Sequence, residues 1–169
     1  TINRLPNSGE SYTFHGRDIY AYTGARLASG CISFEQVGPA VPVESVIELP
    51  VIEPTLNGDV VSGTIDVLDV RFGSLWTNIG RELFWKLGVK HGSRVEVTIS
   101  NGTRTLYKNI MVYAKSFADV NVGEPLLYVN SLDCVAVAFN QGSFSDAYRI
   151  GTGIAWRISL RKAPLIVYE

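Results

Sequence analysis

The pattern of apolar and polar positions changes near residue 45 of the chain. Residues 17–30, RDIYAYTGARLASG, have a helical pattern in which small residues return every three or four positions. These small residues are Ala21, Gly24, Ala25 and Ala28. Gly30 follows them at a place where glycine commonly ends a helix. Such a stripe lets a partner backbone approach closely, and the first 45 residues offer little that would cover it.

Residues 38–58 carry four of the seven prolines of the chain, at positions 39, 42, 50 and 54. Proline lacks the backbone N–H that a helix interior needs, and it suits extended segments. We therefore predict an extended connector here, with a strand over 45–49.

Strand-like patterns follow the connector. Residues 60–70 alternate between apolar and polar positions, and residues 94–100, RVEVTIS, alternate strictly. Asn101-Gly102 then predicts a type I′ hairpin into a strand over 103–112. The other predicted elements are a short helix over 81–87 and strands over 126–130, 135–140 and 153–160. Strands of this length and spacing predict a mainly β fold, with a small antiparallel barrel or sandwich.

Composition excludes several classes of function. With 46% hydrophobic and 18% charged residues among 169, the chain can bury a core, as one domain or as one domain with an appendage. The net charge of −1 and the lack of a basic stripe argue against nucleic acid as a partner. No apolar run approaches the ~20 residues of a membrane span. Cys31 and Cys134 match no metal-binding spacing, which predicts buried, reduced cysteines in a cytoplasmic protein without a metal.

Three polar loops carry the residues that are best suited to recognition. The stretch 72–79, FGSLWTNI, is interpreted as a turn, and it has more hydrogen-bonding and aromatic side chains than a turn requires. The loops 69–79, 116–124 and 130–133 each place an aromatic ring or a small polar group at a strand end. If they converge, Phe72 and Phe117 can sandwich a planar heterocycle while Asp69 holds its polar part.

Four separated motifs, in order along nearly the whole chain, carry a resemblance to a known family. They are TFHGRDI (13–19), D-x-x-F-G-x-x-W-T-N-I (69–79), F-A-D (117–119), and Y-V-N-S (128–131) followed by A-F-N-Q-G-S (138–143). In this combination the chain resembles the S-adenosylmethionine hydroxide adenosyltransferase and fluorinase family.

The resemblance implies an architecture larger than this chain. Family members have an N-terminal α/β domain and a C-terminal β-barrel, and they assemble as trimers with ligand sites between subunits. Residues 1–45 are similar to the strand-helix tail of the N-terminal domain and its linker, and residues 46–169 to the barrel. The expected partner is therefore the N-terminal portion of the enzyme, as a separate or cleaved chain, within a homotrimer.

The resemblance also implies roles for individual residues. Phe72 and Phe117 would stack on adenine, and Asp69 would accept hydrogen bonds from the methionine ammonium group. Ser131 would hold the methionine carboxylate, and Trp76 would form the pocket wall near the ribose. The backbone of Asn140 and Gln141 would contact the adenine edge.

Two positions depart from the family pattern. Ser74 stands where asparagine is usual, so its contact with adenine would be shorter or water-mediated. Leu132 stands where the halogenating members have arginine, so charge pairing to the methionine carboxylate is lost at this position.

His15 is the candidate catalytic residue. S-adenosylmethionine carries its own sulfonium leaving group, so no cofactor is expected, and the enzyme mainly has to position a nucleophile at the ribose C5′. Water attacks faster when a base removes its proton, and histidine is the usual base. The halogenating relatives have a tyrosine-serine pair where this chain has His15-Gly16. The expected reaction is therefore hydrolysis of S-adenosylmethionine to adenosine and methionine.

Other interpretations stay open from the sequence. The chain can be a halide-using 5′-halo-5′-deoxyadenosine synthase of the same family, or a non-catalytic module that binds adenosine. Phe72 and Phe117 can be core aromatics, and Asp69 and Ser131 can be ordinary turn residues. Trp76 can be rim packing and His15 a structural histidine.

Overall fold

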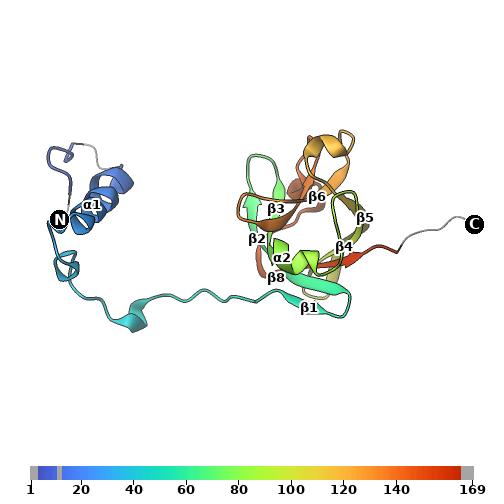
Figure 1. The fold of residues 1–169 in the computed structure, drawn as a ribbon, viewed down its shortest axis with the longest axis horizontal. Helices are drawn as coiled ribbons and strands as arrows, with labels where there is room; N and C mark the ends of the chain where they lie inside the picture. The colour runs from blue at the N-terminus through green and yellow to red at the C-terminus, as the bar shows by residue number, and fades with distance from the viewer. Residues whose placement is uncertain (1–3, 11–12, 165–169) are drawn as a thin grey trace, which may run out of the picture. The chain divides into compact units, whose positions relative to one another are not determined.

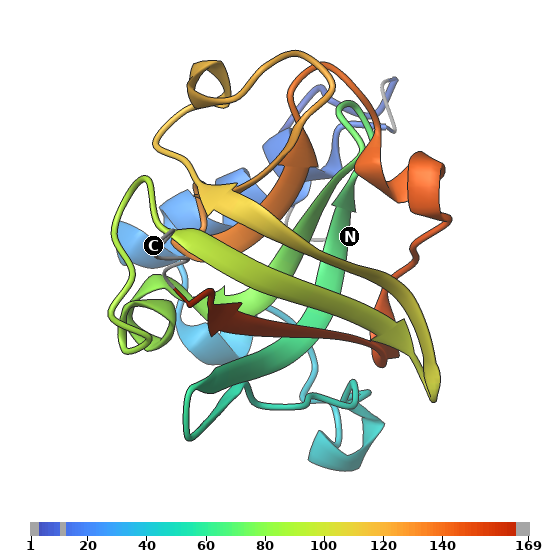
Figure 2. The same ribbon diagram turned by 90° about the vertical axis from the view of Figure 1, so that its right-hand side faces the viewer.

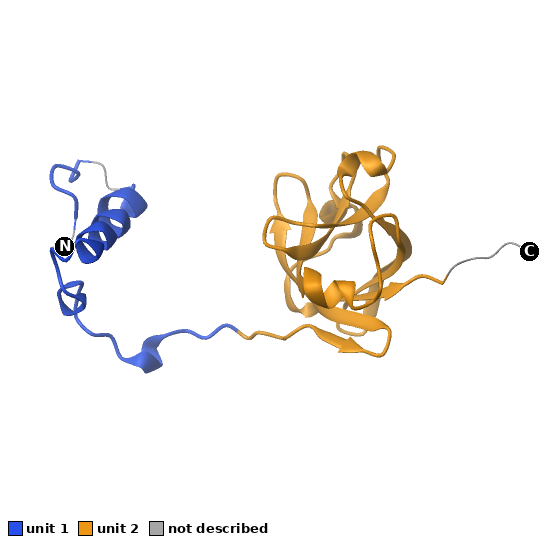
Figure 3. Cartoon of the chain, in the orientation of Figure 1, with its two compact units in different colours: residues 1–49 blue, residues 50–169 orange. Residues whose placement is uncertain are grey.

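The computed structural model describes residues 4–10 and 13–164. The chain divides into two compact units, Thr1–Leu49 and Pro50–Glu169 (Figure 3). This division falls four residues beyond the boundary predicted at 45/46. The origin of the first unit as the tail of an α/β domain stays a prediction.

The first unit is built on the predicted helix. A π-helical segment, η1 (Gly16–Ala21), runs directly into α1 (Tyr22–Ala28). Gly30 then takes a φ of +73°, and the N–H of Cys31 bonds to the carbonyl of Arg26 at 2.9 Å. The helix and its glycine stop are therefore confirmed. The four small residues that form its stripe, Ala21, Gly24, Ala25 and Ala28, are not buried within the chain.

The connector over 38–58 contains one 3₁₀ turn, η3 (Val43–Ser45), and another, η2 (Phe34–Gln36), precedes it. Residues 46–50 belong to no strand. The predicted strand over 45–49 is therefore wrong. A strand needs a neighbour for its backbone hydrogen bonds, and prolines 42 and 50 on either side lack the N–H that such pairing uses.

The second unit is a β-barrel (Figures 1 and 2). Among the described residues, seven strands close in the order β2-β3-β7-β6-β5-β4-β8, because β8 also pairs with β2. The short strand β1 adds to β2 outside this ring. The strands are β1 (Thr55–Asn57), β2 (Val60–Asp69), β3 (Ser74–Gly80), β4 (Arg94–Asn101), β5 (Arg104–Tyr113), β6 (Pro125–Val129), β7 (Cys134–Phe139) and β8 (Gly153–Lys162). The mainly β prediction is confirmed.

The barrel is mixed rather than wholly antiparallel. β5 and β6 run parallel, with Val112 opposite Leu126 and Tyr113 opposite Leu127, and the other described pairs are antiparallel. The connection over 114–124, which includes η4 (Phe117–Asp119), separates these two strands in the sequence. A connection of this length can return the chain to the end where β5 began, which a tight hairpin cannot do.

The predicted turn over 72–79 was wrong for most of its length, because residues 72–73 lie in a turn but 74–80 form strand β3. Ser74, Leu75, Thr77 and Ile79 are buried, and two of the polar residues of this strand bond to distant parts of the chain. Thr77 Oγ1 donates to the carbonyl of Val135 at 2.8 Å. The next residue, Asn78, donates to Ile52 O at 2.7 Å and accepts from the N–H of Thr64 at 2.8 Å. Part of the polar chemistry of this stretch therefore fastens strands together.

The β4–β5 hairpin is turned by Gly102 and Thr103. Asn101 pairs with Arg104 in the ladder, and a register shift between Ile99 and Ser100 accompanies this pairing. Gly102 has a φ of +55°, whereas Asn101 and Thr103 are not among the described residues with positive φ. A type I′ turn needs positive φ at both central residues, so the predicted turn type was wrong.

The core fills the barrel interior. Strict alternation in β4 sends Val95, Val97 and Ile99 inward, as predicted from the sequence. Two short helices, α2 (Arg81–Trp85) and α3 (Phe144–Tyr148), add the fully buried rings of Phe84 and Phe144. None of the helices in the described part of the chain has the length and apolar character needed to cross a membrane.

The cysteines differ from the prediction. Both are free thiols, but Cys31 is exposed and Cys134 is only half-buried. Burial, together with the charges of Asp133 and Asp66, raises the pKa of the Cys134 thiol.

Candidate functional site

A cavity of about 830 Å³ in the second unit gathers the predicted binding residues. Its volume lies in the range typical of small-molecule sites. The cavity is lined by the β2–β3 turn, the loop that contains η4, and the segments on both sides of β7. Its lining includes all eight substrate-binding candidates, namely Asp69, Phe72, Ser74, Trp76, Phe117, Ser131, Asn140 and Gln141.

The β2–β3 turn is held by Asp69. The Asp69 carbonyl accepts from the N–H groups of Phe72 at 3.2 Å and Gly73 at 2.7 Å. Its carboxylate oxygen Oδ1 accepts from the N–H of Arg71 at 3.1 Å. Asp69 therefore acts as a turn residue and lines the cavity as well.

The two candidate stacking rings do not belong to the apolar core. Phe72 is 63% exposed and Phe117 is 39% exposed, although both line the cavity. Large exposed rings beside a cavity are suited to contact with a planar ligand. The interpretation of these two rings as core aromatics is excluded.

The loop that carries Phe117 is fixed by Asp119. The Asp119 carboxylate accepts from the backbone N–H groups of Lys115 at 2.7 Å and Ser116 at 3.0 Å. These hydrogen bonds hold the pKa of Asp119 below its usual range. Phe117 packs against Tyr128, with ring centres 5.2 Å apart and ring planes inclined at 53°.

The turn between β6 and β7 is organised by Asn130 rather than by Ser131. Oδ1 of Asn130 accepts from the N–H groups of Leu132 at 2.9 Å and Cys134 at 3.1 Å. Ser131 is exposed and lines the cavity. Nδ2 of Asn130 and Nε1 of Trp76 are buried without a hydrogen-bond partner in the described part of the chain.

Asn140 ties the loop over 120–124 to the barrel. Its N–H donates to Glu124 O at 3.0 Å, and its carbonyl accepts from Gly123 N–H at 2.7 Å. Its side chain donates to the carbonyl of Val120 at 2.9 Å. The N–H of Asn140, one of the backbone groups expected at the adenine edge, is therefore committed within the chain. Gln141, with a φ of +58°, is exposed beside it.

Ser74 is the remaining residue that was expected to contact adenine. It is 2% exposed and pairs with Asp69 across the β2–β3 ladder.

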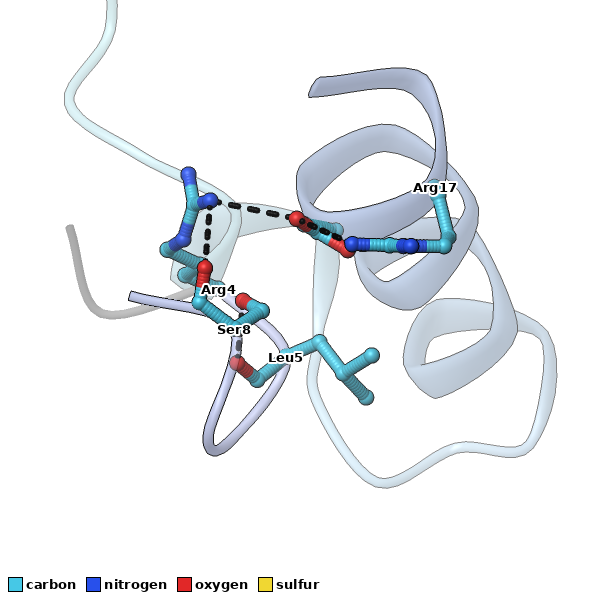
Figure 4. A network of polar contacts seen from close by, with 5 residues as sticks. Arg4, Leu5, Ser8 and Arg17 are labelled. Carbon is cyan, nitrogen blue, oxygen red and sulfur yellow. Dashed lines mark hydrogen bonds and ion pairs between the residues drawn. The ribbon is translucent and has the colours of Figure 1, made fainter. Parts of the chain in front are cut away.

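His15 lies in the first unit, at the residue that precedes η1, and it is exposed there. Three residues further on, Asp18 is fully buried and receives hydrogen bonds from Arg17 and, at 3.1 Å, from Arg4 (Figure 4). Arg4 also donates to the carbonyl of Ser8 at 2.9 Å. The hydrogen bond from Arg17, together with the charges of both arginines, holds the pKa of Asp18 below its usual range despite its burial.

The cavity also has lining residues that sequence reasoning missed. Among them are Arg71, Gly73, Tyr128, Phe139, Ser143 and Asp146. Arg71 and Gly73 lie inside the quoted 69–79 motif, and Tyr128 begins the Y-V-N-S motif, so their positions were a signal. Within the described residues, no group of three or more His, Cys, Asp or Glu side chains is arranged to hold a metal ion.

Comparison with solved structures agrees with the fold. The chain is similar to the crystal structure of an uncharacterized conserved protein from Thermotoga maritima, with 32% identity and a TM-score of 0.68. The match covers 90% of this chain and 54% of that one. A conserved hypothetical protein from Thermus thermophilus matches with 31% identity and a TM-score of 0.51, over 89% of this chain and 51% of that one.

Comparison by sequence defines the family. Residues 63–157 match the model of the SAM hydroxide adenosyltransferase C-terminal domain. The chain therefore belongs to the SAM hydroxide adenosyltransferase family.

The individual relatives carry two different enzyme names. A fluorinase from Actinoplanes sp. (strain N902-109) is 31% identical, over 84% of this chain and 47% of the relative. An (R)-S-adenosyl-L-methionine hydrolase from Salinispora tropica is 34% identical, over 88% and 51%. A hydrolase of the same name from Thermus thermophilus is 33% identical, over 86% and 49%. The chain thus spans about half the length of the curated relatives it matches.

Proposed function

We propose that this chain supplies the adenosyl-binding barrel of an S-adenosylmethionine hydrolase, whose products are adenosine and methionine. The observation that carries the proposal is the meeting of eight residues, chosen from separate segments of the sequence, around one cavity of about 830 Å³. Membership in the S-adenosylmethionine hydroxide adenosyltransferase family adds support.

In this proposal the cavity binds the adenosyl group through stacking. Phe72 and Phe117, both exposed, hold the two faces of adenine. Because the Asn140 N–H is used inside the chain, a backbone donor to the adenine edge comes from Gln141. Trp76 forms the wall near the ribose.

The methionine end is bound by polar groups of two turns. Asp69 accepts from the ammonium group, using the carboxylate capacity that remains after Oδ1 has accepted from Arg71 N–H. The exposed hydroxyl of Ser131 donates to the carboxylate. Removal of water from this end strengthens both contacts.

The reaction is a single displacement at the ribose C5′. The oxygen of water forms a bond to C5′ while the bond from C5′ to sulfur breaks, and methionine leaves as a neutral thioether. His15 takes the proton that the attacking water loses. Adenosine thus receives its 5′ hydroxyl from water.

A halide-using synthase is the second candidate, because a fluorinase is among the relatives at 31% identity. Hydrolysis is favoured by His15-Gly16. Histidine supplies a base for water, whereas Gly16 has no hydroxyl that would donate to a desolvated halide.

The first unit is proposed to bind another polypeptide, the N-terminal portion of the enzyme, within a homotrimer. The supporting observation is the exposure of large apolar side chains in this unit, such as Tyr20 at 71% and Phe34 at 76%. Denaturing intact-mass measurement of the purified protein, with light scattering of the native assembly, should find a second polypeptide and three copies of each. A single polypeptide that scatters as a monomer would contradict this part of the proposal.

The activity is tested by incubating the protein, with any polypeptide that copurifies, with S-adenosylmethionine in high chloride or fluoride. Chromatography should find adenosine as the nucleoside product under both conditions. A halogenated nucleoside as the main product would favour the synthase. Unchanged substrate together with measurable adenosine binding would favour a binding module.

A further inference from the structure

The β2–β3 turn places two opposite charges side by side at the cavity. Asp69 and Arg71 both line it, and Nε of Arg71 lies 3.9 Å from Oδ1 of Asp69. The Arg71 guanidinium carbon lies 5.6 Å from the centre of the Phe72 ring. Both contacts are loose, since 3.9 Å is near the limit for an ion pair and 5.6 Å is near the limit for a cation–π contact. Arg71 therefore keeps hydrogen-bond donors for a ligand.

The charges around the cavity complement an amino-acid ligand. Among the lining residues that the structure describes, Arg71 has the one cationic side chain, and Asp69 and Asp146 are acidic. S-adenosylmethionine carries a sulfonium, an ammonium and one carboxylate, so two positive groups and one negative group need partners. Leu132, which is exposed beside Ser131, offers no charge to the carboxylate.

Hydrogen bonds within the turn fix how the backbone of the acid is placed relative to that of the base. Asp69 Oδ1 accepts from Arg71 N–H at 3.1 Å, and Asp69 O accepts from Gly73 N–H at 2.7 Å, so the turn is closed on both sides of Arg71. An α-amino acid carries its ammonium and carboxylate on the same carbon. An acid and a base two residues apart in a closed turn can therefore bind both groups together.

We propose that Arg71 binds the α-carboxylate of the ligand while Asp69 binds the ammonium group. This inference rests on the proposed function, because it assumes an adenosyl amino acid in the cavity. Arg71 is then a specificity residue, which favours ligands with an intact amino-acid end over nucleosides that lack one. Its planar guanidinium can give a carboxylate two parallel hydrogen bonds, which a lysine cannot do.

The test compares two ligands that differ only in the carboxylate. S-adenosylhomocysteine and its decarboxylated form both lack the sulfonium, so hydrolysis does not consume them during a calorimetric titration. Arg71→Gln should lower the affinity for S-adenosylhomocysteine about tenfold, as expected for the loss of hydrogen bonds to a charged group. The affinity for the decarboxylated form should not change. Arg104→Gln, an exposed arginine of the β4–β5 hairpin that is not among the lining residues, should change neither affinity.

Three other outcomes would each overturn the carboxylate assignment. If Arg71→Gln weakened the binding of both ligands equally, Arg71 would act through Phe72 or Asp69, and the carboxylate assignment would be overturned. Unchanged affinity for both would overturn it too. In either case the proposed function stands, because the wild-type protein still binds adenosyl ligands. A wild-type protein that binds neither ligand nor adenosine would overturn the proposed function and this assignment together.

Discussion

Gly73 and Ser143 lie so close together that a β-carbon on Gly73 would be 2.0 Å from Oγ of Ser143. The carbonyl of Gly73 also accepts from the N–H of Ser145 at 3.0 Å, which joins the β2–β3 turn to the start of α3. Gly73 has a φ of +66°, a conformation that glycine adopts without cost. This contact holds two walls of the cavity together.

Gly73→Ala should therefore destabilise the protein and weaken adenosine binding. The new methyl group must push back Ser143, and overpacking of this kind costs about 1–3 kcal/mol. Gly58→Ala is the matched control, because Gly58 has a similar φ of +60° but open space around it. Urea unfolding should find the larger loss of free energy in Gly73→Ala. Equal losses in the two variants would show that backbone strain alone explains the effect.

Phe72→Ala and Phe117→Ala should each weaken adenosine binding by about 1–3 kcal/mol, in line with base stacking on aromatic side chains. Both rings are exposed, so the barrel should keep its far-UV circular dichroism. Ile154→Ala, at an exposed apolar residue of β8 that does not line the cavity, serves as the control and should bind adenosine normally. If calorimetry finds wild-type affinity in the first two variants, the stacking model is wrong.

His15→Ala should slow adenosine formation by about 100-fold to 10,000-fold, the usual effect of losing a positioned base. The affinity for adenosine should stay the same, because His15 is assigned to the water and not to the nucleoside. His91→Ala removes the other histidine of the chain and should keep its activity. Full activity in His15→Ala would require a different base.

The free energy of unfolding should change at high pH because of Tyr107. Its side chain is 6% exposed. Burial, with a smaller effect of Tyr148, raises the pKa of Tyr107 to about 12 from 10.0. Because the folded state favours the neutral phenol, its contribution to stability is complete below pH 10 and is lost as the pH rises toward 12.

Tyr107→Phe should not show this loss. The free energy of unfolding of the variant should rise relative to that of the wild type above pH 10, because phenylalanine has no phenol to ionise. Urea titrations of the variant and the wild type at neutral and alkaline pH measure this difference. A Tyr107→Phe advantage that does not change with pH would contradict the raised pKa.

Local patterns predicted the elements whose structure depends on local causes. Strict alternation identified β4, and small-residue periodicity with Gly30 identified the helix of the first unit. The strand β3 was missed because its polar residues are satisfied by distant partners. Thr77 bonds to Val135 and Asn78 bonds to Ile52, and neither contact is visible in the local pattern.

The candidate site was predictable to the extent that its residues lie in recognisable motifs. Phe72, Phe117 and Ser131 were proposed from polar loops and from the family resemblance, and they meet at one cavity. Asp146 was missed because it lines the cavity only through the packing of α3 against β3 and β7, which no local pattern predicts. The parallel pairing of β5 with β6 was missed for the same reason.

The most direct test of the hydrolase proposal is the origin of the oxygen in the product. The protein, with any copurifying polypeptide, is incubated with S-adenosylmethionine in ¹⁸O-labelled water, and the nucleoside is analysed by mass spectrometry. Attack of water at C5′ predicts adenosine with one ¹⁸O in its 5′ hydroxyl and an equal amount of unlabelled methionine. Formation of 5′-methylthioadenosine, or of adenosine without the label, would contradict displacement by water at C5′.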